Sequence, residues 1–134
     1  MIKNEQLVRD AMQIIWNECD VSRVSEFYSD DFKADYPHTD WGTGLEGVCA
    51  LATQVHNDLP GYTEDIEQLI DAGDKIIVIL SISGSHPVSG DEISFRDVTV
   101  LTIKDDKIIS QRGVGDLLTL YLKLGMIDLP SSTE

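Results

Sequence analysis

The spacing of hydrophobic positions in this chain changes near its middle. Up to Leu59, apolar side chains recur every three or four residues, as in Leu7, Ala11 and Ile15, which is the spacing of an amphipathic helix. From Tyr62 onward, β-branched residues gather in alternating runs that are typical of strands. The pattern therefore predicts helices first and a sheet afterwards.

The first half predicts three helices joined by short segments. Thr43 is followed three residues later by Glu46, which is the spacing of a capping box and marks a helix start. Pro60 ends that helix, and a short strand or loop over residues 32–41 precedes it. The predicted helices cover residues 4–17, 21–29 and 43–59, with Asn4 and Asp20 as caps of the first two and Asp30-Asp31 ending the second.

The second half predicts consecutive β-hairpins. Strands are expected at 63–70, 75–86, 93–103 and 108–115, with turns at 72–74 and 105–106 and a last helix at 117–124. Helices followed by hairpins favour one α+β domain, in which the helices cover one face of a curved antiparallel sheet. We expect this domain to span residues 1–134, with a polar tail from about residue 129.

The side chains that share a sheet face follow from the register of the last hairpin. A tight loop at Asp105-Asp106 would place Thr99 opposite Arg112 and Phe95 opposite Asp116. One face would then be an apolar wall, and the opposite face would suit a dimer contact. A single bulge would invert this assignment. If the loop after His86 also keeps parity, the same face receives residues of the preceding strand. The predicted apolar wall then holds Leu80, Ile82 and Phe95 together with the ionisable groups His86, Asp97, Arg112 and Asp116.

Composition excludes several kinds of partner. The 24 acidic and 10 basic residues give a net charge of −14, which disfavours nucleic acid and anionic membranes. No apolar run is long enough to span a membrane, and acids and Arg9 interrupt the first twenty residues, so we expect a cytoplasmic protein. Cys19 and Cys49 lack metal-site spacing, and no cofactor motif is present. Neither a metal nor a cofactor is therefore predicted.

The candidate chemistry centres on Asp116, which has two interpretations. It can cap the helix 117–124, which Gly125 ends, or it can act as the acid/base of a pocket in which apolar neighbours raise its pKa. His86 beside Pro87 is either a second acid/base or a turn residue. Asp97 and Arg112 are either part of a site or an ion pair that satisfies itself.

The order of several segments resembles a known family. They are IIWNECDVSRVSEFYSDDF (14–32), LPGYTEDIEQLIDAGDK (59–75), GSH (84–86) and ISFRDVTVLTIKDDKIISQRGVGDLL with LGM after it. Together they resemble the SnoaL-like polyketide cyclase or ester cyclase family of the nuclear-transport-factor-2-like superfamily. The resemblance covers nearly the whole chain.

The resemblance implies a cone-shaped α+β barrel with three helices against a bent sheet, an internal pocket and a homodimer. The family's cyclases close a ring by intramolecular aldol condensation without a metal or cofactor. Their acid/base is an aspartate at the end of the last strand, which matches Asp116, and a pocket histidine matches His86. Relatives often carry a Trp where this chain has Arg112, and this departure favours a pocket that holds an anion.

These observations predict a cofactor-independent cyclase, isomerase or lyase acting on a small hydrophobic carbonyl compound. Asp116 would move the proton, His86 would assist, Arg112 would hold negative charge and Asp97 would orient Arg112. The alternative is a non-catalytic ligand-binding or dimerisation domain of the same fold. The remaining predicted substrate-binding residues form the pocket wall: Phe95, Leu80, Ile82, Tyr36 and Trp41.

Overall fold

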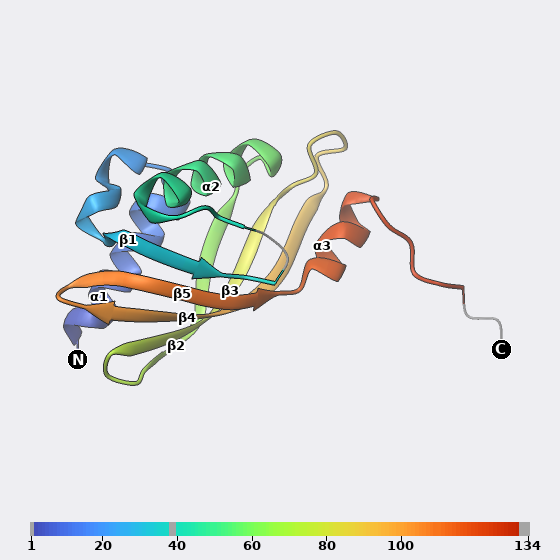
Figure 1. The fold of residues 1–134 in the computed structure, drawn as a ribbon. Helices are drawn as coiled ribbons and strands as arrows, with labels where there is room; N and C mark the ends of the chain where they lie inside the picture. The colour runs from blue at the N-terminus through green and yellow to red at the C-terminus, as the bar shows by residue number, and fades with distance from the viewer. Residues whose placement is uncertain (1, 38–39, 132–134) are drawn as a thin grey trace.

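A five-stranded sheet and the helices that cover it make up the α+β fold of this protein (Figure 1). The structure is a computed structural model, and it describes residues 2–37 and 40–131. The strand order is β1-β5-β4-β3-β2. The elements are α1 (Ile2–Ala11), a π-helix (Met12–Asn17), a 3-10 helix (Val21–Glu26), β1 (Tyr28–Asp35), α2 (Gly44–Asp58), β2 (Thr63–Asp71), β3 (Lys75–Ser85), β4 (Glu92–Lys104), β5 (Lys107–Gly115) and α3 (Leu117–Leu124).

The strand β1 corrects two predictions. Asp30 and Asp31 do not end a helix but lie inside β1, and the predicted second helix is only the short 3-10 turn before it. β1 pairs in parallel with β5, so the sheet is not entirely antiparallel. The acids are tolerated because β1 is an edge strand: Tyr28 and Phe32 are buried, whereas Asp31 is exposed.

The first predicted helix is continuous, but it begins before residue 4 and changes from an α-helix to a π-helix at Met12. α1 begins at Ile2, so Asn4 lies inside the helix, and its amide donates a hydrogen bond of 3.0 Å to the Gly73 carbonyl. The π-helix that follows turns Met12, Ile15 and Trp16 into the core. Thr43 occupies the predicted N-cap position of α2, although its side chain makes no capping bond.

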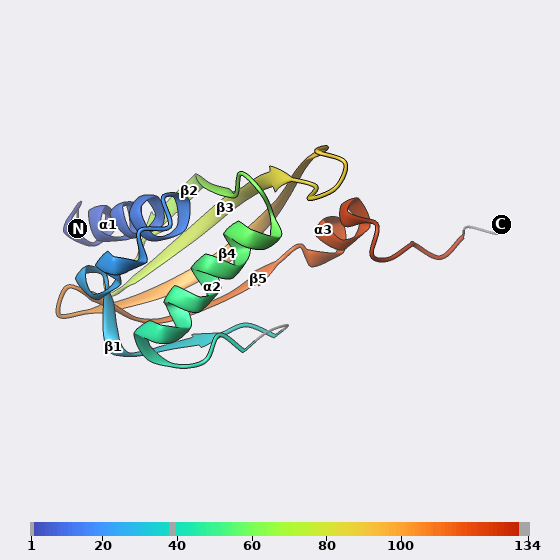
Figure 2. The ribbon, with the colours of Figure 1, turned by 90° about the horizontal axis from the view of Figure 1, so that it is seen from above.

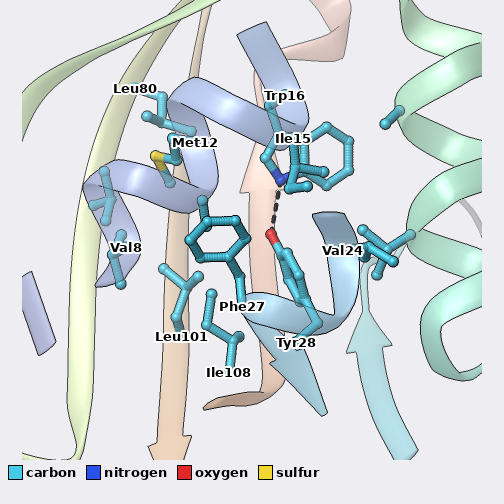
Figure 3. Packing of buried hydrophobic residues seen from close by; sticks show 14 of the residues in the cluster. Val8, Met12, Ile15, Trp16, Val24, Phe27, Tyr28, Leu80, Leu101 and Ile108 are labelled. Carbon is cyan, nitrogen blue, oxygen red and sulfur yellow. Dashed lines mark hydrogen bonds between the residues drawn. The ribbon is translucent and has the colours of Figure 1, made fainter. Parts of the chain in front are cut away.

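The main hydrophobic core lies between these first helical turns and the sheet. Figure 3 shows Val8, Met12 and Ile15 packed towards Leu101 and Ile108 of β4 and β5. One polar pair is buried within this core. The Trp16 indole N–H donates a hydrogen bond of 2.8 Å to the Tyr28 hydroxyl, so neither group is left unsatisfied.

Two further helices define the space beside the core. α2 crosses over the sheet, and α3 lies beyond the end of β5, beside the β3–β4 loop (Figures 1 and 2). Gly125 ends α3 with φ of 75°, as predicted for its C-terminus. None of the helices in residues 2–37 and 40–131 is both long and apolar enough to cross a membrane.

The β4–β5 hairpin contains an irregularity that the sequence did not predict. Its two-residue turn is formed as expected, with φ of 51° at Asp105 and 64° at Asp106. Ile103 then pairs with Ile108, whereas Thr102 pairs with Ser110, so Ile109 is an additional residue. This β-bulge shifts the register of the rest of β5 by one residue.

Candidate functional site

A cavity of about 660 Å³ lies between α2, the π-helix and the inner face of the sheet, with α3 at its end. Its wall combines apolar and aromatic side chains with a few polar groups, which is the usual make-up of a small-molecule site. The wall includes Trp16, Tyr36, Trp41, Tyr62, Glu64, Leu80, Ile82, His86, Phe95, Asp97, Gln111, Leu117, Leu120 and Leu124.

Because of the bulge at Ile109, a different set of β5 residues faces this cavity. Asp97 pairs with Gly115 and Thr99 with Gly113, and paired residues share a sheet face. The two glycines leave room for their neighbours. A Cβ atom at Gly115 would lie 2.9 Å from Asp97 Oδ2, and one at Gly113 would lie 2.9 Å from a ring carbon of Tyr36.

The predicted position of Arg112 was wrong. It was expected on the inner face with Asp97, but it pairs with Val100 on the outer face. Its side chain is 74% exposed and lies 3.8 Å from the Asp35 carboxylate. The ion pair between Asp97 and Arg112 is therefore absent, and the positive charge that suggested an anion-binding pocket lies outside the cavity.

The predicted inward position of Asp116 was also wrong, for the same reason of register. Asp116 is exposed and caps α3: its carboxylate accepts hydrogen bonds from the Thr119 backbone N–H at 3.1 Å and the Thr119 hydroxyl at 2.6 Å. These bonds hold the pKa of Asp116 below its usual value. Of the two interpretations that the sequence left open, the geometry matches the helix cap.

The side chain of Asp97 faces the cavity, where Arg112 and Asp116 were expected. Asp97 pairs with Leu80 across β3 and β4, and Phe95 lies on the same face. Burial in these apolar surroundings raises the pKa of Asp97 to about 6. Among the described residues, no hydrogen-bond donor reaches its buried Oδ1 atom. A carboxylate in this condition binds a proton or a donor group readily.

A second acid, Glu64, lies deeper in the wall and was not among the predicted site residues. Asn17 at the end of the π-helix holds its backbone through bonds of 2.6 Å to the Glu64 N–H and 3.0 Å to the Glu64 carbonyl. The Tyr62 hydroxyl donates a short hydrogen bond to its carboxylate. Burial and the nearby charge of Asp97 outweigh that bond and raise the pKa of Glu64 to about 7.

A hydrogen-bonded chain on the cavity wall joins Tyr36, which follows β1, to residues of β4 and β5. The Tyr36 hydroxyl lies 2.8 Å from Thr99 Oγ1. The Gln111 side-chain amide donates a hydrogen bond of 2.8 Å to the same Tyr36 hydroxyl. The ring of Tyr36 stacks on Trp41 with centroids 4.9 Å apart. Gln111 is 7% exposed, and nothing among the described residues donates to its Oε1 atom.

His86 lines the cavity near α3, and both of its ring nitrogens are in use. Nδ1 accepts hydrogen bonds from the backbone N–H groups of Val88 and Ser89, at 3.0 and 3.1 Å. Nε2 therefore carries the proton and donates to the Leu124 carbonyl at 3.1 Å. The ring thus ties the β3–β4 loop to the last turn of α3.

The structure separates the predicted site residues into two groups. Asp116 and Arg112 lie outside the cavity. Those on its wall are His86, Asp97, Phe95, Leu80, Ile82, Tyr36 and Trp41.

Glu64 and Gln111 were missed, although two signals in the sequence pointed to them. Strand alternation places Glu64 two residues after Tyr62, on the same face. Two glycines spaced by two, Gly113 and Gly115, indicate a strand face against which other groups pack closely. In the described residues, His, Cys, Asp and Glu do not form any group of three or more placed to hold a metal.

Comparison with known proteins gives a consistent result. The family model of the SnoaL-like polyketide cyclases matches residues 6–124. A search of curated proteins finds no significant match. Among solved structures, TsrD from Streptomyces laurentii is similar, with a TM-score of 0.82 and 21% identity over 94% of this chain and 97% of that chain.

Two bacterial proteins show the same likeness. A SnoaL-like polyketide cyclase from Agrobacterium tumefaciens has a TM-score of 0.75 and 18% identity over 91% of this chain and 98% of its own. A protein from Bacillus cereus, proposed to be a polyketide cyclase, has a TM-score of 0.77 and 27% identity over 85% and 75% of the two chains.

Proposed function

The chain belongs to the SnoaL-like polyketide cyclase family, and from this premise we propose that it is a cofactor-independent enzyme that moves a proton on a small hydrophobic carbonyl compound. The observation that supports this proposal is the position of Asp97. Its carboxyl group faces an apolar cavity without a cationic partner among the described residues, and its pKa is raised to about 6. A base in that range is suited to work near neutral pH.

In the proposed reaction, Asp97 in its ionised form removes a proton from the carbon next to a substrate carbonyl. The electron pair moves onto the carbonyl oxygen and forms an enolate. Glu64 has a pKa of about 7, so it is partly protonated at neutral pH and can donate a hydrogen bond to that oxygen. The two carboxyl groups therefore have complementary roles, as base and as hydrogen-bond donor.

The enolate can react in two ways, and in both of them the proton taken up by Asp97 returns to the product. In a cyclisation, its carbon attacks a second carbonyl of the same molecule, a carbon–carbon bond forms, and the new alkoxide takes the proton from Asp97. In an isomerisation, the proton returns to a different carbon. Neither route consumes a cofactor, and both leave Asp97 ionised for the next turn.

His86 has a positioning role in this proposal rather than the predicted role of a second acid/base. Its Nδ1 and Nε2 atoms are occupied by the β3–β4 loop and by the Leu124 carbonyl. A ring that holds α3 against the cavity keeps Leu117 and Leu120 on the wall. His86 thus acts through the shape of the pocket.

The proposal is tested by deuterium exchange at the α-carbon of a bicyclic ketone, 2-tetralone, followed by NMR. Asp97→Asn keeps the shape of the side chain but cannot act as a base, so exchange should fall by about 100-fold or more. Asp116→Asn is the matched control and should exchange at the wild-type rate. Undiminished exchange in Asp97→Asn would overturn the proposal. Binding of 2-tetralone without any exchange would instead support a non-catalytic binding domain.

For the assembly we propose a homodimer through the outer face of the sheet. Val98 and Val114 lie on that face and are 40% and 66% exposed, which is unusual for large apolar side chains that have no partner. Val114→Glu should convert the dimer to a monomer in sedimentation velocity, with the cavity unchanged. A wild-type chain that sediments as a monomer at micromolar concentration would contradict this assembly.

A further inference from the structure

The orientation of the Gln111 side chain can be worked out from its neighbours. Thr99 has one hydroxyl hydrogen, and it donates this hydrogen to the Arg112 carbonyl at 3.2 Å. With the Thr99 hydrogen on the Arg112 carbonyl, the contact of 2.8 Å between Thr99 and the Tyr36 hydroxyl uses the hydrogen of Tyr36. The Tyr36 oxygen then accepts from the Gln111 amide nitrogen at 2.8 Å. A backbone carbonyl thus sets the direction of every hydrogen bond in this chain.

The consequence is that Gln111 presents its amide oxygen, not its nitrogen, to the cavity. Turning the amide over would place two acceptors, the Gln111 and Tyr36 oxygens, against each other. Gln111 Oε1 is buried and has no donor among the described residues. A buried acceptor without a partner is unfavourable, so this atom is suited to accept a hydrogen bond from a donor in the cavity, such as a hydroxyl or N–H group of a ligand.

The charges around the cavity limit what that ligand can be. Asp58, Glu64 and Asp97 all line it, and the described lining residues include neither Lys nor Arg. Arg112, which could have held an anion, is exposed on the outer face beside Asp35. A carboxylate on the ligand would meet like charges without compensation.

We propose that Gln111 is a specificity-determining residue that accepts a hydrogen bond from a hydroxyl or N–H group on an uncharged substrate. Gln111 pairs with Leu101, and Asp97 lies two residue pairs further along the same sheet face. The donor group is therefore at the opposite end of the substrate from the carbon that Asp97 deprotonates. The inference rests on the proposed function only because both place the substrate in this cavity.

Three naphthalene probes test the inference by isothermal titration calorimetry at pH 8. They are 2-naphthol, which donates a hydrogen bond, 2-methoxynaphthalene, which only accepts one, and 2-naphthoate, which is an anion. The wild-type chain should bind 2-naphthol about tenfold more tightly than the methyl ether, and it should not bind 2-naphthoate measurably. Equal binding of the alcohol and the ether, or no binding of either, would overturn the inference.

Two variants assign the preference to Gln111. Gln111→Met should bind the alcohol and the ether equally. Tyr36→Phe keeps the stacking on Trp41 but removes the acceptor that holds the amide nitrogen, so the amide can turn and the preference should fall to about twofold. Gln54 also lines the cavity, but its amide donates to Asp58. Gln54→Met is therefore the matched control and should keep the tenfold preference.

The Asp97→Asn variant separates this inference from the proposed function. It should keep the preference for 2-naphthol while it loses deuterium exchange. If the preference vanished in Asp97→Asn and survived in Gln111→Met, then Asp97 and not Gln111 would accept the hydrogen bond from the hydroxyl group of 2-naphthol. The inference would then be wrong even though the proposed function was right.

Discussion

The two faces of the β4–β5 hairpin shift the pKa of an aspartate in opposite directions. On the inner face, Asp97 lies among apolar residues and its pKa is raised to about 6. At the end of the outer face, Asp116 is exposed and its bonds to Thr119 lower its pKa. The difference shows that the surroundings, and not the residue type, decide which aspartate can serve as a base near neutral pH.

A single residue decides which surroundings each aspartate receives. Without the additional Ile109, Arg112 and Asp116 would face the cavity, and Gln111, Gly113 and Gly115 would face outward. The bulge therefore replaces an Arg–Asp pair with a glutamine and two glycines on the cavity wall. It also leaves the Asp97 carboxylate without a Lys or Arg partner among the described lining residues. The predictions below test this contrast between the faces, starting with the largest expected effect.

The strongest test places the same new side chain on each face. Gly113→Val would bring a Cβ atom within 2.5 Å of the Val98 carbonyl oxygen and 2.9 Å of the Tyr36 ring. The free energy of unfolding in urea should fall by about 4 kcal/mol. Arg112→Val puts valine on the exposed outer face, and its effect should stay below about 1 kcal/mol. Equal losses in the two variants would contradict the assignment of faces.

The second test is the pH profile of ketone exchange. Exchange needs Asp97 ionised, so the rate should fall tenfold for each pH unit below about 6 and be about 100-fold below its maximum at pH 4. Because Glu64 donates when protonated, a second decline should begin above about pH 7. Glu64→Gln should remove the alkaline decline and keep the acidic one. A flat profile across pH 4–8 would exclude Asp97 as the base.

The third test concerns stability. Burial raises the pKa of Glu64 from 4.5 to about 7, so the folded state binds this proton more tightly than the unfolded state does. The contribution of Glu64 to stability is fully present below pH 4.5 and is lost as the pH rises through about 7. At pH 8, Glu64→Gln should be about 2 kcal/mol more stable than the wild type in urea unfolding. At pH 4 the advantage should disappear; one that persisted there would point to a cause other than ionisation.

The smallest effect is expected at Asp116. Asp116→Ala removes both bonds to Thr119, so the last helix should fray and Tm should fall by a few degrees at pH 7. The folded pKa of Asp116 is lowered, so its stabilising effect is present above the usual value of 3.8 and is lost as the pH falls below it. The two Tm curves should converge in acid. Loss of ketone exchange in this variant would contradict the capping role.

Much of the fold could be predicted because local patterns and packing agree. The β-branched runs at 75–86 and 93–103 became β3 and β4 nearly to the residue, and Pro60 ended α2 as expected. The first half of β1 was missed because Asp30 and Asp31 break the strand pattern, whereas the strand or loop predicted at 32–41 overlaps its second half. The tolerance of these two acids depends on an edge position beside β5, and that position is a long-range property of the sheet.

The site was less predictable because it depends on register. The faces of β3 and β4 were assigned correctly from alternation and from the assumption that the loop after His86 keeps parity, which placed Leu80 and Asp97 on one wall. Nothing in the local sequence around Ile109 marks a bulge, and one inserted residue reverses every later side chain. Glu64 was overlooked because it lies in β2 among other acidic residues, and most of the β2 side chains are exposed.

The acidic residues of β2 also help to protect the protein from aggregation. β2 is the outermost strand on its side of the sheet, so one row of its backbone N–H and C=O groups has no neighbouring strand. Open edges of this kind can recruit strands from other molecules and grow into fibrils. The sequence of β2, TEDIEQLID, contains four acids and neither lysine nor arginine. Two such edges would repel each other, so the four acids of β2 prevent the sheet from pairing with the β2 edge of another molecule.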